Sequence, residues 1–267
     1  MKARVEVANS LCVFRLLSHD PPVATGTRGS LTMRTETLSR PAMRSWYAIP
    51  PAESALDAHA TMMRLHNGES ICHTAEAAEF CYRLVSGAAR KWAVMSSGSR
   101  RIMDFLFPDD LFGIDESLRW GFEVEVMVDH TSIARYPRRL VERLADSDPL
   151  VARRIREAAL KSITRLESRM LILSLGLARQ RVCAFLLEIA NRLGDSRCQG
   201  EIGLPMPRCD IADYLGIAVE TVSRVLTQLR LEGLIRFTGL RRLRVCDRGA
   251  LERICEPDAC CRARSCG

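Results

Sequence analysis

The chain has 267 residues, of which 47% are hydrophobic and 27% charged, an ordinary composition for a globular protein with a substantial core. It contains no apolar run of about eighteen residues, and Arg15 interrupts the apolar stretch near the N-terminus. We therefore expect no membrane span, no secretory signal and a cytoplasmic location. The net charge of +7 is concentrated in residues 1–50 and 178–254. A basic C-terminal region suits a polyphosphate partner, although many solvated surfaces are equally basic.

The N-terminal half is expected to hold a weakly structured extension followed by a β domain. Residues 1–50 show no sustained hydrophobic period and are rich in Gly, Pro, Ser, Thr and Arg. In residues 51–145, short apolar runs alternate with turn residues, which is typical of an antiparallel sandwich or barrel. The strands are expected at 70–72, 80–85, 91–95, 102–107, 123–128 and 132–136. Gly87 marks a hairpin between two of them.

A long helix is expected over residues 146–177, capped by Asp146, Ser147 or Asp148 and with Pro149 in its first turn. Its apolar residues recur at steps of three and four, at Val151, Ile155, Ala159, Ile163, Leu166, Met170, Leu173 and Leu177. Such a stripe packs either on the core of its own domain or against a second helix. We favour a dimer helix, because the stripe is narrow and its flanks are charged. A shorter, more evenly apolar helix at 180–193 is expected inside the next domain.

The segment 209–228 predicts a helix-turn-helix within a domain spanning residues 178–250. A short helix over 210–215 ends at Gly216, and a second helix starts near residues 218–219. The steep crossing needs a small residue at the approach, which Ala212 provides. Apolar side chains wedge the two helices together, at Ile211, Leu215, Ile217, Val222, Val225 and Leu226. Two short strands around residues 238–242 then predict a wing with an arginine-rich tip.

The outer face of the second helix carries the groups that could read DNA, namely Glu220, Thr221, Ser223, Arg224 and Gln228. Arg224 can donate two hydrogen bonds to the O6 and N7 edge of guanine, and Glu220 can accept one from the amino group of cytosine. A carboxylate near DNA lowers the binding affinity unless it accepts a hydrogen bond from a base. We therefore expect Glu220 to contribute to specificity rather than to affinity. Arg208, Arg241 and Arg242 are expected at the phosphate backbone.

The sequence closely resembles the CRP/FNR superfamily, and within it the FixK-like branch, in two segments: Leu204-Pro-Met-Pro-Arg-Cys-Asp-Ile-Ala-Asp-Tyr-Leu-Gly216 and Val219-Glu-Thr-Val-Ser-Arg224. The resemblance implies an α+β fold: an N-terminal antiparallel β-roll of the cyclic-nucleotide-binding type, a long dimerisation helix and a C-terminal winged helix-turn-helix. It also implies a homodimeric transcription regulator, most often an activator, on a TTGAT-N4-ATCAA-type inverted repeat of double-stranded DNA. RNA polymerase is an implied partner, and a low-oxygen or nitrogen-oxide response is an implied theme.

The chain departs from its cyclic-nucleotide-binding relatives where they carry an Arg-Ser or Arg-Thr phosphate cradle. Gly121 and Phe122 stand there, beside Glu123 and Glu125, whose carboxylates would repel a cyclic phosphate. We therefore expect no cAMP binding. The N-terminal cysteine cluster of iron–sulfur relatives is also absent, since only Cys12 lies in that region.

The eleven cysteines leave two hypotheses open. Cys209 begins the first helix of the motif beside Arg208, and both features favour a thiolate, so its oxidation could block DNA binding. The alternative is an inert, partly buried thiol. The tail 251–267 contains Cys255, Cys260, Cys261 and Cys266, which could bind zinc or an iron–sulfur cluster or could form a frayed, reactive tail.

An enzyme is not expected, because the sequence lacks a Gly-rich phosphate loop, a metalloprotease motif and a nucleophile elbow. The five histidines share no ligand spacing. Two alternatives to a dedicated DNA-binding regulator stay open. One is a small-molecule-binding β domain with little specific DNA affinity, and the other is a cysteine-based redox or metal-sensing regulator.

Overall fold

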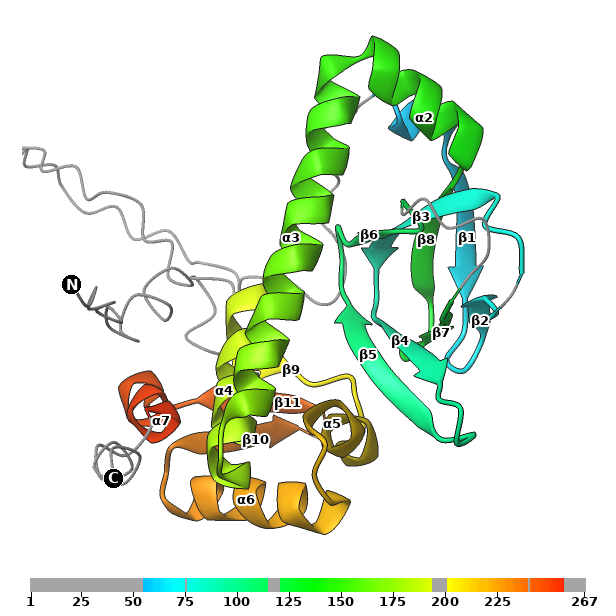
Figure 1. The fold of residues 1–267 in the computed structure, drawn as a ribbon. Helices are drawn as coiled ribbons and strands as arrows, with labels where there is room; N and C mark the ends of the chain where they lie inside the picture. Colours follow the sequence, from blue (N-terminus) through cyan, green and yellow to red (C-terminus); the bar gives the residue numbers. More distant parts are fainter. Residues whose placement is uncertain (1–54, 75, 115–120, 194–200, 240, 257–267) are drawn as a thin grey trace, which may run out of the picture. The chain divides into compact units, whose positions relative to one another are not determined.

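The computed structural model describes residues 55–74, 76–114, 121–193, 201–239 and 241–256. Its N-terminal part is a β-roll of two four-stranded antiparallel sheets, with strand orders β1-β8-β3-β6 and β2-β7-β4-β5 (Figure 1). The 3-10 turn η1 precedes the strands at Asp57–His59. The strands are β1 Thr61–Leu65, β2 Ser70–Cys72, β3 Phe80–Ser86, β4 Ala89–Val94, β5 Arg100–Leu106, β6 Leu111–Phe112, β7 Glu123–Val126 and β8 Thr131–Pro137.

Alternation of buried and exposed side chains explains why these segments form a roll. In β7, Val124 and Val126 are fully buried, while Glu123 and Glu125, which alternate with them, are half-buried. One face of the strand therefore points between the sheets. Gly87 joins β3 to β4 with a φ of +89°, and an added Cβ would collide with Thr131. The predicted turn at Gly87 is present, but the predicted hairpin is wrong: β3 and β4 belong to different sheets and do not pair with each other, so the turn carries the chain from one sheet to the other. β1 and β6 were not predicted from the sequence.

Two consecutive helices follow the roll: α2 over Arg138–Ser147 and α3 over Pro149–Ser174. Asp148 separates them, and its carboxylate accepts a hydrogen bond from the N–H of Leu150 at 2.8 Å. This confirms one of the three predicted caps, with Pro149 in the first turn. α2 was not predicted, because its few apolar residues lie among charged ones and only Val141 is buried.

The apolar stripe of α3 divides into a buried and an exposed part. Val151 near its start is fully buried against the roll, together with Tyr136. Large apolar side chains farther along are exposed: Leu160, Ile163, Leu166, Met170, Leu171, Leu173 and, just past the helix, Leu177. The alternative in which α3 packs on its own domain thus describes the first turns of the helix. The exposed part is available to a second helix.

The C-terminal part is a winged helix-turn-helix built on the buried helix α4 (Figure 1). Its elements are α4 Ala178–Leu193, β9 Glu201–Gly203, α5 Arg208–Leu215, α6 Val219–Leu231, β10 Ile235–Gly239, β11 Arg242–Val245 and α7 Arg248–Cys255. The strands form one antiparallel sheet in the order β10-β11-β9. α4 is evenly apolar as predicted, with Val182, Phe185 and Leu186 fully buried. Within the described residues, no helix has the length and apolar character needed to cross a membrane.

Candidate nucleic-acid interface

A tight turn at residues 216–218 joins α5 to α6. Gly216 adopts a φ of +63°, a left-handed conformation that favours glycine at the end of a helix. The N–H of Ile217 then donates to the carbonyl of Ala212 at 3.0 Å, which satisfies an otherwise free carbonyl of α5. The predicted turn at Gly216 and the predicted start of the second helix are confirmed. α5 begins two residues earlier than predicted, at Arg208.

The two helices are held together by the apolar side chains that the sequence indicated. The buried members are Ile211, Ala212, Leu215, Val222, Val225 and Leu226, and Ile217 packs partly buried against the same core. Tyr214 and Leu229 complete this contact. Between its exposed terminal residues Val219 and Leu231, the apolar residues of α6 face inward, so the other side chains form one polar face.

That polar face carries the predicted reading residues. Glu220 and Arg224 are exposed and lie one turn apart, while Thr221 and Ser223 are half-buried. Neither Glu220 nor Arg224 forms an ion pair with another residue in the described ranges. Arg208 extends across from α5 and donates to the hydroxyl of Ser223 at 3.2 Å. The structure thus brings Arg208 together with the reading residues of α6.

The wing is the β10–β11 hairpin, where Ile235 pairs with Val245 and Phe237 with Leu243. Arg241 at its tip is exposed, and its guanidinium donates to the carbonyl of Met127 in the β-roll at 3.4 Å. Arg242 begins β11 and is half-buried. The proposed role of both wing arginines at phosphate remains a prediction.

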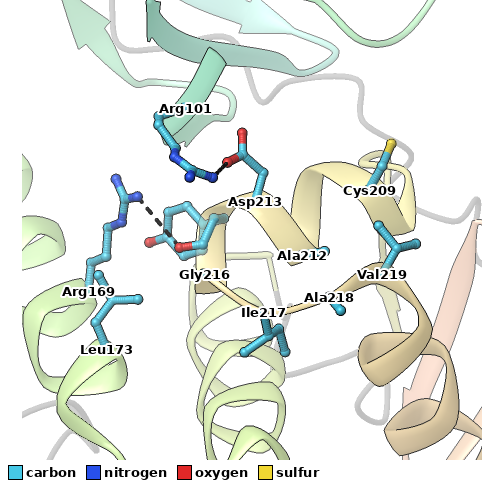
Figure 2. Close-up of a pocket in the computed structure, with 11 residues that line it drawn as sticks. Arg101, Arg169, Leu173, Cys209, Ala212, Asp213, Gly216, Ile217, Ala218 and Val219 are labelled. Carbon is cyan, nitrogen blue, oxygen red and sulfur yellow. Dashed lines mark hydrogen bonds and ion pairs between the residues drawn. The ribbon is translucent and has the colours of Figure 1, made fainter. Parts of the chain in front are cut away.

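The β4–β5 hairpin of the roll makes direct contact with α5. Arg90 and Arg100 approach the buried carboxylate of Asp210 at 2.6 and 3.3 Å. Arg101 lies 3.0 Å from Asp213, and Figure 2 shows the two side chains pointing toward each other. The sequence analysis did not identify this group. A first-turn aspartate in α5 was a visible signal, but its partners lie more than a hundred residues earlier in the chain.

A cavity of about 590 Å³ opens beside the α5–α6 turn (Figure 2). Four elements and the α5–α6 turn line it, with Arg101 from β5, Arg169 and Leu173 from α3, Asp213 from α5 and Val219 from α6. The cavity therefore lies between the helix-turn-helix and the exposed part of the apolar stripe.

The cysteines differ widely in exposure. Cys209 is exposed in the first turn of α5, and its sulfur lies 3.9 Å from a carboxylate oxygen of Asp210. Cys183 and Cys255 are buried, and burial raises the pKa of each thiol to about 12. Buried thiols of this kind are inert at neutral pH. Cys209 is therefore the reactive candidate among these three.

The predicted cysteine tail is described only at its first member. Cys255 ends α7, and its thiol contacts the carbonyl of Gln180 at 3.8 Å. Cys260, Cys261 and Cys266 lie outside the described residues, as do the extension 1–50 and Cys12. No cluster of three metal-ligating side chains occurs in the described part of the chain. A zinc or iron–sulfur site at these cysteines stays a prediction.

Glu123 and Glu125, which were expected to repel a cyclic phosphate, are half-buried in β7. Glu125 is ion-paired with Arg90, and Glu123 lies 3.6 Å from the imidazole of His73. Partial neutralisation weakens the predicted repulsion. The absence of cAMP binding remains a prediction.

Two family models match the chain. A Crp-like helix-turn-helix domain matches residues 180–254, and a cyclic nucleotide-binding domain matches residues 62–148. Together they cover the winged domain and the β-roll, in the order that the sequence analysis expected.

Individual relatives agree with these models. The nitrogen fixation regulation protein FixK of Azorhizobium caulinodans is 36% identical over 181 residues, covering 67% of this chain and 73% of the relative. The protein of the same name from Rhizobium meliloti is 32% identical over 175 residues, covering 66% and 78%. The solved structure of FixK2 from Bradyrhizobium japonicum is 36% identical, with a TM-score of 0.68, and the match covers 75% of this chain and 99% of that one.

Proposed function

Because this chain belongs to the FixK-like branch of the CRP/FNR superfamily of transcription regulators, we propose that it binds a TTGAT-N4-ATCAA-type inverted repeat as a homodimer. The observation that carries the proposal is the polar face of α6. Glu220 and Arg224 are exposed there without ion-pair partners among the described residues, on a helix whose opposite face is buried at Val222, Leu226 and Leu229.

The side chains on this face match the edges of a G·C base pair. The guanidinium of Arg224 donates to O6 and N7 of guanine, and the carboxylate of Glu220 accepts from the amino group of cytosine. Ser223 and Thr221 are short and meet a thymine or a phosphate. In this proposal the pair Glu220 and Arg224 determines sequence preference.

Arginines around α6 supply the contacts that do not depend on sequence. Arg208 lies beside Ser223 and is exposed, so it can reach a phosphate next to the bases that α6 reads. Arg241 and Arg242 of the wing would contact the backbone of the neighbouring segment. Each such contact releases condensed counterions, which makes binding salt-dependent.

The exposed part of the α3 stripe supports the homodimer. Exposed apolar side chains at steps of three and four, such as Ile163, Leu166 and Met170, fit the seam between two parallel helices. A two-fold pair would present two α6 helices to successive major-groove segments about 34 Å apart. The inverted repeat of the proposed site has the same symmetry.

The names of the relatives support a regulatory theme. Besides the FixK proteins, similar chains include the transcriptional activator proteins FnrA of Stutzerimonas stutzeri and FnrL of Cereibacter sphaeroides. We accordingly propose an activator that contacts RNA polymerase in a low-oxygen or nitrogen-oxide response, with neither cAMP nor another cofactor required. Transcription from a promoter bearing the repeat, in a purified system with and without the protein, tests activation.

The decisive experiment is a mobility-shift titration at fixed salt. The full-length protein is titrated on a duplex with TTGAT-N4-ATCAA and on the same duplex with its G·C pairs replaced. Tight binding that is lost on replacement is expected. Equal, salt-sensitive binding to both duplexes would contradict the proposal and favour the small-molecule-binding alternative.

Redox control through Cys209 is a second proposal, favoured by the exposure of its sulfur in the first turn of α5. The thiolate attacks one oxygen of hydrogen peroxide, the O–O bond breaks, hydroxide leaves and a sulfenic acid forms. Sulfur loses two electrons, and the peroxide is reduced. Peroxide should weaken binding by the native protein, and Cys209→Ser should be insensitive. A serine variant that binds normally yet stays peroxide-sensitive would eliminate the idea.

A further inference from the structure

The first helix of the motif is attached to the β-roll at two points one turn apart. Asp210 contacts Arg90 and Arg100, and Asp213 contacts Arg101. We call these five residues the hairpin clamp, because the arginines all come from the β4–β5 hairpin. Residues three apart on a helix share a face, so both acids point away from the core between α5 and α6.

The inner contact of the hairpin clamp is buried and shared. Arg90 bridges Asp210 and Glu125, and Arg100 lies between the same two carboxylates while resting over the ring of Trp92 at 5.0 Å. Two guanidinium groups therefore balance two carboxylates, of which Asp210 is buried and Glu125 is half-buried. Buried pairs of this kind hold one geometry, since displacement of either partner leaves an unpaired buried charge.

The outer contact is more exposed and fixes the second point. One carboxylate oxygen of Asp213 lies 3.0 Å from Arg101, and the other accepts the backbone N–H of Ile102 at 2.9 Å. A backbone donor has little freedom, so this bond sets the distance between β5 and α5. Arg169 of α3 adds to it by donating to the carbonyl of Ile102 at 2.7 Å.

The helix-turn-helix does not need these acids for its own packing. Its core consists of apolar side chains such as Leu215 and Val222, which lie on the opposite side of α5. Two aspartates facing water would be satisfied by solvent. The hairpin clamp therefore acts between the β-roll and the DNA-binding domain, where it restricts how α5 is oriented.

We propose that Asp210 and Asp213 are positioning residues through which the β4–β5 hairpin holds α6 in the orientation needed to occupy both half-sites at once. The inference rests on the proposed dimeric reading of an inverted repeat. A protomer with a loosened domain would still bind one half-site with its own α6. The α6 helix of the other protomer would then be correctly oriented for its half-site only part of the time. The affinity gained by binding both half-sites at once would therefore fall.

The outer pair allows a test that spares the buried contact. Arg101→Glu, Asp213→Arg and the double swap are titrated on a full-site duplex and on a duplex with a single half-site. Each single variant should weaken full-site binding about ten-fold if the competent orientation falls to about a tenth of the population, and half-site binding by less than about two-fold. The double swap should restore part of the full-site affinity, because opposite charges face each other again, although an arginine at position 213 cannot accept the N–H of Ile102.

A second ion pair provides a matched control for the change in charge. Arg153 and Glu157 of α3 form an exposed pair with a separation of 2.8 Å and do not contact α5. Arg153→Glu and Glu157→Arg alter net charge in the same way as the test variants. They should leave the ratio of full-site to half-site affinity unchanged. Circular dichroism on each variant confirms folding.

The possible outcomes are distinct. Equal loss on both duplexes, unchanged or tighter full-site binding, or failure of the swap to restore affinity would each overturn the positioning role. If the wild-type protein did not prefer the full site over a duplex with replaced G·C pairs, the proposed function itself would be wrong, and this inference with it. Specific wild-type binding combined with no effect of the variants would refute the inference alone.

Discussion

α5 and α6 are adjacent helices that share one apolar core, yet the charged side chains on their polar faces differ in exposure and in ion pairing. The acids of α5 are paired with arginines of the β-roll, and Asp210 is buried. The polar groups of α6 at Glu220 and Arg224 are exposed, without ion pairs in the described ranges. The comparison distinguishes charged side chains that attach α5 to the β-roll from charged side chains on α6 that are available to bind a ligand. Four substitutions test this distinction, from the largest expected effect to the smallest.

The largest effect is expected from a substitution in the apolar core that α5 and α6 share. Leu215 ends α5 and is fully buried against α4 and α6. Leu215→Ala leaves a cavity and should lower the free energy of unfolding by about 2–5 kcal/mol. Chemical denaturation followed by circular dichroism measures this loss. A loss well under 1 kcal/mol would mean that the site collapses around the smaller side chain.

Glu188 of α4 represents a third case, a carboxylate that is neither exposed nor fully paired. Both of its oxygens are buried without a hydrogen bond of standard geometry among the described residues, and Arg192 lies 3.8 Å away. Asp104, Arg165 and Tyr214, from three other elements, also act on its charge. Burial raises the pKa of Glu188 to about 7, an effect that Arg192 reduces.

The pH dependence follows from this raised pKa. The folded protein holds the Glu188 proton more tightly than the unfolded chain, whose carboxyl titrates near 4.5. The contribution of Glu188 to stability is therefore fully present at low pH and is lost as the pH rises from about 4.5 to about 7. Glu188→Gln should remove that loss, on the order of 3 kcal/mol, so the variant gains on wild type as the pH rises. Parallel stability curves from pH 5 to 8 would contradict the prediction.

Arg224→Ala tests the open face of α6. Loss of a bidentate contact to guanine should cost about 1–3 kcal/mol on the full site and should reduce discrimination against duplexes with replaced G·C pairs. Stability should barely change, because the guanidinium is exposed. Titrations on both duplexes measure the effect. Equal weakening on the two would assign Arg224 to the phosphate backbone.

Arg208→Ala should have the smallest effect and a different signature. Loss of one phosphate contact should weaken binding to all sequences alike and reduce the slope of log affinity against log salt by about 1 per protomer. The measurement is a titration at several salt concentrations. A change in sequence preference would show instead that Arg208 acts by orienting Ser223, to which it donates a hydrogen bond.

The sequence revealed most of the features that are local along the chain. Gly216 ends α5 in a left-handed backbone conformation, which glycine adopts readily. The spacing of the apolar residues in α5 and α6 determines which side chains pack between the two helices. Asp148 and Pro149 likewise predicted the start of α3. These features depend on neighbours within a few residues, so pattern and propensity are sufficient to find them.

Features that depend on distant partners were not found. Nothing near Asp210 in the sequence indicates that Arg90 neutralises it, because that contact exists only after β4 and α5 have packed. The hydrogen bond from Arg241 of the wing to the carbonyl of Met127 in the β-roll also joins residues far apart in the sequence, and it was not predicted. The short helix α2 was also not predicted, and within it only Val141 is buried.

Arg169 has a consequence for symmetry. Its guanidinium donates to the carbonyls of Met103 and Ile102 in β5 and approaches that of Tyr214 in α5, and the next residue, Met170, is 66% exposed in the apolar stripe. α3 cannot turn about its own axis without breaking these bonds. The direction in which the stripe faces is thus set inside one chain. A second chain could therefore pack against the stripe only from that side. In a homodimer, hydrogen bonds within each chain would then determine where the two-fold axis lies.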